Sequence, residues 1–160
     1  MELWDLYDCN RKKLGKTHRR GVPVPEGCYH LVVHAWIQNS KGEILLSKRH
    51  PNKHYGGLWE CAGGSVLAGE SSLEGVIRET REELGLEIDP DSLSLLYRHL
   101  KPTYHSDYWL AYSNADIASL NLQDTEVIAA KWVDRHTYYR MIRNGEIVPT
   151  LPDFYKLLSD

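Results

Sequence analysis

The chain has 160 residues, with 19 Lys and Arg against 22 Asp and Glu and a formal net charge of -3. An apolar fraction of 42% and a charged fraction of 26% are ordinary globular values, so residues 1–160 are expected to form a single domain. The near balance of charge argues against a protein that binds a nucleic acid polymer through a basic face, and against a polybasic membrane anchor.

No apolar run approaches the roughly 18 residues that a membrane span requires, and the first residues lack the basic-then-apolar layout of a secretory signal. We therefore expect a cytoplasmic protein with no membrane segment. The three cysteines, Cys9, Cys28 and Cys61, are widely spaced and include no Cys-x-x-Cys pair. They are expected to be reduced thiols with a structural role.

Strand signals dominate the first 50 residues. Residues 2–20 predict a hairpin around a turn at 10–15, and a loop at 22–27 completes an N-terminal extension, residues 1–27. Residues 29–37 are rich in β-branched and aromatic side chains, and a turn at 39–42 leads to a second strand at 43–48. A glycine-bearing loop is expected from 50 to 64.

One strong helix signal follows. Ser71 and Glu74 have capping-box spacing, apolar residues recur at helical intervals from Leu73 to Leu84, and Gly85 is a natural stop. Strand-like runs follow at 93–100, 107–113 and 127–133, and residues 135–144 and 152–158 predict helices. Strands on both sides of a central helix, with helices at the end, indicate an α/β fold with a mixed central sheet covered by helices.

The central helix carries an acidic cluster. At about 100° per residue, Glu79, Glu82 and Glu83 share one arc, away from the apolar face. A solvated helix face is the simplest interpretation, but like charges at i and i+4 cost a helix about 0.2–0.5 kcal/mol per pair. Clustered carboxylates without Cys or His suit a hard divalent cation such as Mg²⁺, which also accepts ligands from substrate phosphates.

The wider spacing carries a family resemblance. Gly64, Glu70 and the run Arg78-Glu79-Thr80-Arg81-Glu82-Glu83-Leu84-Gly85-Leu86 are similar to the signature of the Nudix hydrolase superfamily, GX5EX7REUXEEXGU, over residues 64–86. Thr80 is the one departure, since the pattern prefers a bulkier aliphatic residue there. The resemblance implies a Nudix α/β/α sandwich, here with an N-terminal β-hairpin, and a MutT-like pyrophosphohydrolase activity.

The resemblance also implies roles for single residues. Glu79, Glu82 and Glu83, with the backbone carbonyl of Gly64, are expected to bind Mg²⁺, for which Mn²⁺ could substitute. Glu70 and Arg78 look like the pair that supports the loop and orients the helix. The expected reaction is attack of water on phosphorus in a diphosphate linkage, in which the metal neutralises oxygen charge and lowers the pKa of the water.

The general base is not fixed by the motif. Glu79 is one candidate, and Glu126, before the late strand, is another. The resemblance gives Glu82 a catalytic role through the metal. His105 and Asp107, expected in a loop, are less favoured residues that could also reach the site.

Substrate contacts are expected from Lys48 and Arg49, which could pair with phosphate oxygens. Four aromatic residues could stack on a base, although alternating aromatic residues in strands are more often core: Tyr55, Tyr104, Tyr108 and Trp109. The expected partner is a small phosphorylated molecule whose leaving group is recognised by loops 50–57 and 101–106. The hairpin is a candidate homodimer interface.

Two alternatives remain open. The front of the chain, including His30, resembles the Nudix subgroup related to isopentenyl-diphosphate isomerase. However, Gly63 and Ser65 occupy the positions of the isomerase's catalytic Cys and metal-binding His, and Cys61 lies two residues away, a slip that strand pairing resists. Hydrolysis is therefore favoured. The second alternative is a catalytically silent nucleotide-binding domain, against which the intact motif argues.

Overall fold

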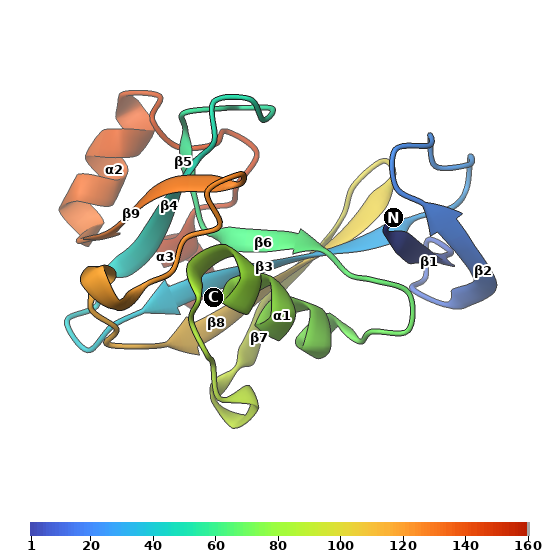
Figure 1. The fold of residues 1–160 in the computed structure, drawn as a ribbon, viewed down its shortest axis with the longest axis horizontal. Coiled ribbons are helices and arrows are strands. Elements are labelled where there is room, and N and C mark those ends of the chain that lie inside the picture. Colours follow the sequence, from blue (N-terminus) through green and yellow to red (C-terminus); the bar gives the residue numbers. More distant parts are fainter. Residues whose placement is uncertain (160) are drawn as a thin grey trace.

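The computed structural model describes residues 1–159 and contains two sheets (Figure 1). The first is an antiparallel N-terminal hairpin of β1 (Leu3–Tyr7) and β2 (Lys13–Arg19). The second is a seven-stranded mixed sheet. Its strands are β3 (His30–Gln38), β4 (Ile44–Arg49), β5 (Trp59–Glu60), β6 (Ala62–Ser65), β7 (Ser94–Leu100), β8 (Tyr104–Tyr112) and β9 (Val127–Val133).

The larger sheet has two halves that meet at β3 and β4. In one half, β3 pairs in parallel with β8 and antiparallel with β6, while β7 pairs with β8. In the other, β4 pairs antiparallel with β5 and β9. The halves join where Gln38 pairs with Ile44. Among the described strands β6 pairs with β3 alone, and its residues 63–65 line the pocket described below.

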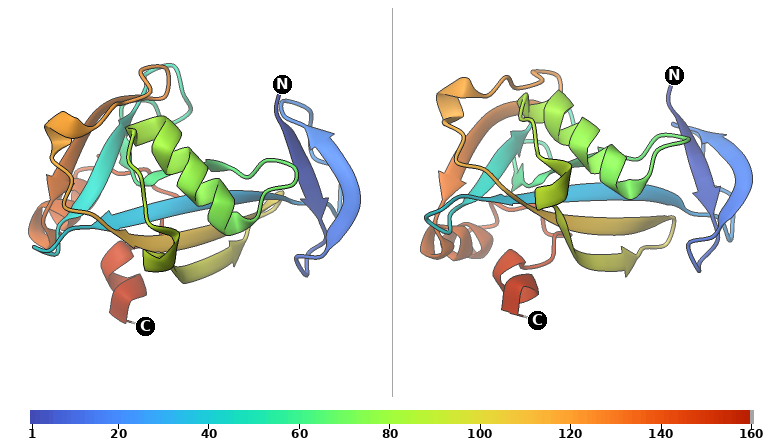
Figure 2. Two further views of the ribbon diagram at one scale, coloured as in Figure 1. Left: turned by 60° about the horizontal axis from the view of Figure 1, so that its bottom comes forward. Right: turned by 90° about the horizontal axis from the view of Figure 1, so that it is seen from below.

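Helices cover both faces of the sheet, as Figure 2 shows. Helix α1 (Ser72–Leu84) packs on one face, and α2 (Arg135–Arg143) and α3 (Phe154–Ser159) contribute to the core on the other. Strand alternation supplies both cores: Val33 and Ala35 face α1, whereas Trp36 packs with Tyr138 and Phe154. The expected α/β/α sandwich with a mixed central sheet is confirmed.

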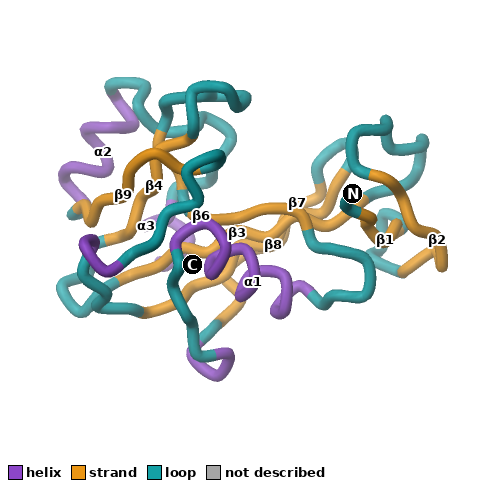
Figure 3. The backbone as a smooth tube through the Cα atoms, in the orientation of Figure 1, coloured by secondary structure: helices purple, strands orange, loops and turns teal. Residues whose placement is uncertain are grey.

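Most predicted elements appear with small boundary shifts, and the N-terminal hairpin is present. The short strand β5 lies inside the expected loop at 50–64, and β6 begins inside that loop and ends at Ser65. Strand β8 begins at Tyr104, before the expected start at 107. Strands of two and four residues are too short to show an alternating pattern, and their pairing depends on the neighbouring strands. The tube in Figure 3 shows the segment between β4 and β5 as loop.

The hairpin is anchored to the main sheet by several contacts. Tyr7 forms an antiparallel bridge with Tyr29, and the Trp4 ring stacks on His30 with 3.9 Å between centroids. Arg11 donates two hydrogen bonds of 2.7 Å to the buried carboxylate of Asp107. These contacts fix the hairpin beside the open edge of β6. No helix in the described part of the chain is long and apolar enough to cross a membrane.

Candidate active site

Helix α1 begins and ends as its sequence predicts. The Ser71 hydroxyl accepts a hydrogen bond of 3.1 Å from the Glu74 amide, and Gly85 ends the helix with φ of 65°. Thr80, the departure from the motif, is fully buried and donates its hydroxyl proton to the Val76 carbonyl at 2.8 Å. The helix therefore accommodates Thr80 without an unpaired hydroxyl.

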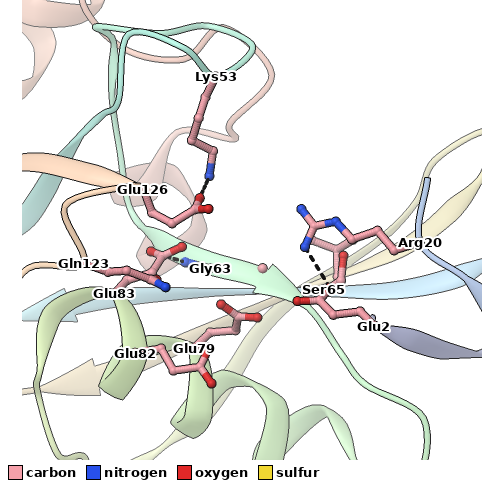
Figure 4. A pocket seen from close by; sticks show the side chains of 12 residues that line it. Glu2, Arg20, Lys53, Gly63, Ser65, Glu79, Glu82, Glu83, Gln123 and Glu126 are labelled. Carbon is pink, nitrogen blue, oxygen red and sulfur yellow. Dashed lines mark hydrogen bonds and ion pairs between the residues drawn. The ribbon is translucent and has the colours of Figure 1, made fainter.

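The acidic face of α1 borders a pocket of about 150 Å³, which we call the carboxylate pocket (Figure 4). Its acidic walls are Glu2, Glu79, Glu82, Glu83 and Glu126, its basic walls are Arg20 and Lys53, and Val32, Gln123 and residues 63–65 of β6 complete it. The three motif glutamates and Glu126 thus face one small space, although they come from segments more than 40 residues apart.

The glycines of β6 allow the carboxylates to approach the strand. A Cβ added at Gly64 would lie 2.4 Å from the Glu79 carboxyl carbon and 2.5 Å from each carboxylate oxygen. The Glu83 carboxylate accepts a long hydrogen bond of 3.4 Å from the Gly63 amide. Residue 64 must therefore lack a side chain if Glu79 is to keep this position.

Burial raises the proton affinity of two of these acids. It raises the pKa of Glu79 to about 7, against the opposing effect of Arg78, with a smaller contribution from the charge of Glu82. Burial, reinforced by the charges of Glu79 and Glu60, raises the pKa of Glu83 well above its usual range. Crowded, half-desolvated carboxylates of this kind are stabilised by a nearby cation.

The donor set fits a hard divalent ion. The oxygens of Glu79, Glu82 and Glu83 face the same space as the Gly64 backbone, and such ligands suit Mg²⁺ or Mn²⁺. Within residues 1–159, however, no group of three or more His, Cys, Asp or Glu side chains is already arranged around one metal position. Binding would require these carboxylates to converge.

Arg78 connects the helix to the preceding loop and to β6. Its guanidinium donates to Glu70 at 2.6 and 3.1 Å, to the Ser65 carbonyl at 3.0 Å, and to Glu79 at 3.0 Å. It also reaches Glu82 at 3.1 Å. The planar fork of an arginine can satisfy this many acceptors, which a lysine cannot do. Arg78 thus connects Glu70, β6 and the acidic residues of α1 through one side chain.

Glu126 lies on the opposite wall of the carboxylate pocket, where it forms an ion pair with Lys53 (Figure 4). The backbone links the same two segments, because the His50 amide donates to the Glu126 carbonyl at 3.0 Å. Loop 50–57 therefore carries Lys53 to the site and holds Glu126 beside it.

The two expected phosphate-binding residues have different positions. The Arg49 guanidinium donates to Glu60 at 2.8 and 2.9 Å and borders a second pocket, which we call the bridging pocket and which shares Lys53, Gly63 and Gly64 with the carboxylate pocket. Lys48 instead lies over the Trp59 ring, 5.9 Å from its centroid, and does not line the carboxylate pocket. The position of Lys48 does not support the expected phosphate contact.

An aromatic pocket of about 320 Å³ adjoins the bridging pocket, with which it shares His34, Arg49 and Glu60. Tyr55, Tyr104 and Tyr108 line it, together with Lys101. Three of the four candidate stacking residues are thus brought together. Trp109 is elsewhere: its indole donates to the Ser72 hydroxyl at 3.0 Å, and its ring packs against the core beside α1.

His105 and Asp107 do not belong to a loop near the site. Both are buried in β8, where His105 contacts the Asp8 carbonyl at 2.8 Å and Asp107 binds Arg11 and the Ser72 hydroxyl. This corrects the expectation that they could reach the site, because β8 begins earlier than its sequence indicated. The three cysteines are free, and burial raises the pKa of Cys61 well above its usual range.

Several residues that line the carboxylate pocket were not predicted from the sequence as site residues: Glu2, Arg20, Val32, Lys53, Gly63, Ser65 and Gln123. Lys53 lies in a loop that the sequence marked for specificity, so its charge was a usable signal. Arg20 belongs to the basic run His18-Arg19-Arg20, in which nothing distinguishes one cation from its neighbours.

The chain is similar to known proteins in both sequence and fold. The family model of the NUDIX domain matches residues 29–156. A Nudix hydrolase of Listeria monocytogenes, named as uncharacterised, is 36% identical over 151 residues, which cover 93% of this chain and 89% of the relative. A Deinococcus radiodurans crystal structure superimposes with a TM-score of 0.74 at 25% identity and covers 92% of both chains.

The class of protein defined by this fold and site is therefore the Nudix pyrophosphohydrolases, and the chain belongs to the Nudix hydrolase family. It is also 32% identical to an isopentenyl-diphosphate Delta-isomerase of Escherichia coli over 127 residues, 75% of this chain and 70% of the relative. The N-terminal hairpin lies outside the residues that the family model matches.

Proposed function

We propose that this protein is a Mg²⁺-dependent hydrolase that cleaves the diphosphate linkage of a nucleoside diphosphate derivative or a related organic diphosphate. The observation that carries the proposal is the arrangement of Glu79, Glu82, Glu83 and Glu126 around one pocket beside the Gly64 backbone. When bound there, a divalent ion would supply charge neutralisation and a more acidic attacking water.

The residues of the chain divide the remaining work. Glu79, Glu82 and Glu83, with the Gly64 carbonyl, would hold the ion, while Arg78 and Glu70 keep the helix in register with β6. Glu126 is our first candidate for the general base, since it faces the acidic cluster across the pocket and Lys53 holds its position. Glu79 is the second candidate.

The organic part of the substrate would occupy the aromatic pocket, because the bridging pocket connects it to the carboxylates. Tyr55 and Tyr104 line the aromatic pocket and would stack on that group, and Arg49 borders both the aromatic and the bridging pocket. This arrangement favours a diphosphate attached to a planar or apolar group over free inorganic diphosphate.

Isomerisation is the less favoured activity. A Cβ at Gly63, the position of the isomerase's catalytic Cys, would lie 2.3 Å from the Val33 carbonyl oxygen and 3.0 Å from the His34 Nδ1 atom. The buried Cys61 does not replace it, because its raised pKa disfavours a reactive thiolate.

The test is a phosphate-release screen with Mg²⁺ over nucleoside triphosphates, nucleotide sugars, dinucleoside polyphosphates, coenzymes and isoprenoid diphosphates. Glu83→Gln should lower turnover by about 10²-fold or more, whereas Glu87→Gln, an exposed acid on the segment after α1, should not change it. Full activity of Glu83→Gln would refute the metal assignment. Conversion of isopentenyl diphosphate to dimethylallyl diphosphate would favour the isomerase, and nucleotide binding without turnover would favour a silent domain.

A further inference from the structure

The N-terminal hairpin contributes a cation to the carboxylate pocket. Glu2 and Arg20 line its outer wall (Figure 4), although residues 1–28 lie outside the segment that the family model matches. The Arg20 guanidinium donates to the Glu2 carboxylate at 2.7 Å, and the Arg20 amide donates to the Glu2 carbonyl at 3.1 Å. The N-terminal hairpin region therefore forms part of the wall of the carboxylate pocket, in addition to packing against the main sheet.

The position of Arg20 is fixed by the way the hairpin is held. Trp4 and Leu6 are buried, the Gly69 amide donates to the Asp5 carboxylate at 2.9 Å, and the Ala68 amide donates to the Leu3 carbonyl at 2.8 Å. These bonds connect β1 directly to the loop before α1. Arg20 directly follows β2 and bonds to the backbone of Glu2 beside β1, so these contacts with the loop before the acidic helix position it at the pocket.

Each cation of the carboxylate pocket is paired with a carboxylate, and a phosphate group could take the place of that carboxylate. The two cations, Arg20 and Lys53, lie on different walls, and each is paired with a carboxylate, Glu2 and Glu126 respectively. The side chains of Arg20 and Glu2 are 58% and 39% exposed, and exposed ion pairs contribute little free energy. Exchanging Glu2 for a phosphate group would therefore cost little, and the arginine fork binds phosphate oxygens in a bidentate manner.

We propose that Arg20 is a substrate-binding residue that holds a phosphate oxygen of the diphosphate, and that Glu2 competes with the substrate for its guanidinium. The proposal rests on the function proposed above. It adds a residue of the N-terminal extension to the binding site. In the free protein the Arg20–Glu2 ion pair keeps the guanidinium in place, and a phosphate of the substrate then displaces the Glu2 carboxylate.

The test measures binding of methylenediphosphonate, a diphosphate analogue that resists hydrolysis, by calorimetry at pH 7.5 with excess Mg²⁺. Arg20→Ala should weaken binding at least tenfold, because a charge-assisted hydrogen bond is lost, and Arg20→Lys should retain part of the affinity. Arg19→Ala is the matched control, since Arg19 is exposed and does not line the pocket; its affinity should equal that of the parent.

Glu2→Gln should tighten binding several-fold, because the amide competes less well for Arg20. In the Arg20→Ala background the same change should have no effect; an equal gain there would show that Glu2 acts only through its charge and would overturn the competition. Equal affinity of Arg20→Ala and the parent, or no binding by the parent, would overturn the proposal as a whole.

Turnover separates this proposal from the hydrolase assignment. Against the substrate found in the screen, Arg20→Ala should raise KM about tenfold or more, while Arg19→Ala leaves KM and kcat unchanged. If the parent hydrolyses a substrate and Arg20→Ala matches it in KM and in analogue affinity, the hydrolase assignment stands and the Arg20 proposal fails. If the parent hydrolyses nothing, the hydrolase assignment fails and the analogue affinities still decide the role of Arg20.

Discussion

Gly64 and Glu79 are so close that a single added Cβ on the glycine would lie 2.4 Å from the carboxyl carbon of the glutamate. The contact joins β6 to α1 and places the carboxylate against the strand backbone. It explains in steric terms why the motif begins with a glycine.

Gly64→Ala should therefore displace the Glu79 carboxylate and lower turnover by about 10²-fold, since small misplacements of reacting groups are costly. The obstacle is a side chain at a pocket wall, so we expect the fold to persist. Steady-state kinetics and thermal unfolding of the variant measure the two effects separately. A variant with parental turnover would show that the position of Glu79 does not matter.

Arg78 should not tolerate replacement by lysine. Its side chain is 18% exposed and donates to Glu70, the Ser65 carbonyl and Glu79. A lysine cannot serve these acceptors together, so Arg78→Lys should cost about 1–3 kcal/mol of unfolding free energy and lower turnover at least tenfold. Urea denaturation and kinetics measure this.

Arg81→Lys provides the control for that change. Arg81 is 54% exposed and pairs with Glu87 on the surface, so its replacement should change stability by less than about 0.5 kcal/mol. Equal losses in the two lysine variants would mean that the Arg78 contacts add nothing specific.

Asp107 should be important for stability, although it lies outside the carboxylate pocket. Its fully buried carboxylate accepts hydrogen bonds from Arg11 at 2.7 Å and from the Ser72 hydroxyl at 2.6 Å, and so joins the hairpin, β8 and the start of α1. Asp107→Asn leaves Arg11 without its counter-charge and should cost about 3 kcal/mol, measured by urea denaturation. Arg98, 51% exposed and 3.5 Å from the same carboxylate, should cost less than about 1 kcal/mol when changed to Gln.

Acidification should destabilise the protein through His30. Burial, with smaller contributions from the charges of His18 and Arg20, lowers the pKa of His30 from 6.5 to about 4. Because the unfolded chain takes up this proton first, the stability present above pH 6.5 is lost as the pH falls toward 4, by about 2 kcal/mol at pH 5. Burial lowers the pKa of His34 in the same direction.

Thermal unfolding of His30→Phe between pH 7 and pH 5 tests this, since phenylalanine keeps the stacking surface against Trp4 and cannot be protonated. The variant should lose about 2 kcal/mol less than the parent over this range. The exposed His136 serves as control, and His136→Gln should follow the parent. Parallel curves for His30→Phe and the parent would contradict the assignment.

Local patterns of residues were sufficient to predict the acidic helix and its ends. Capping by Ser71, the stop at Gly85 and the spacing of Glu79, Glu82 and Glu83 are local properties, because helical periodicity and capping act over a few residues. The alternating runs of β3, β4 and β9 were readable for the same reason, and the family motif lies within one short segment.

The groups that face that helix are brought there by long-range contacts. Pairing β6 with β3 brought Gly64 against Glu79, and packing of the hairpin and of loop 50–57 brought Arg20 and Lys53 to the same pocket. The register of β8 buried Asp107 away from it. These contacts join segments far apart along the chain, so they follow from sheet pairing and core packing, which no local pattern of residues encodes.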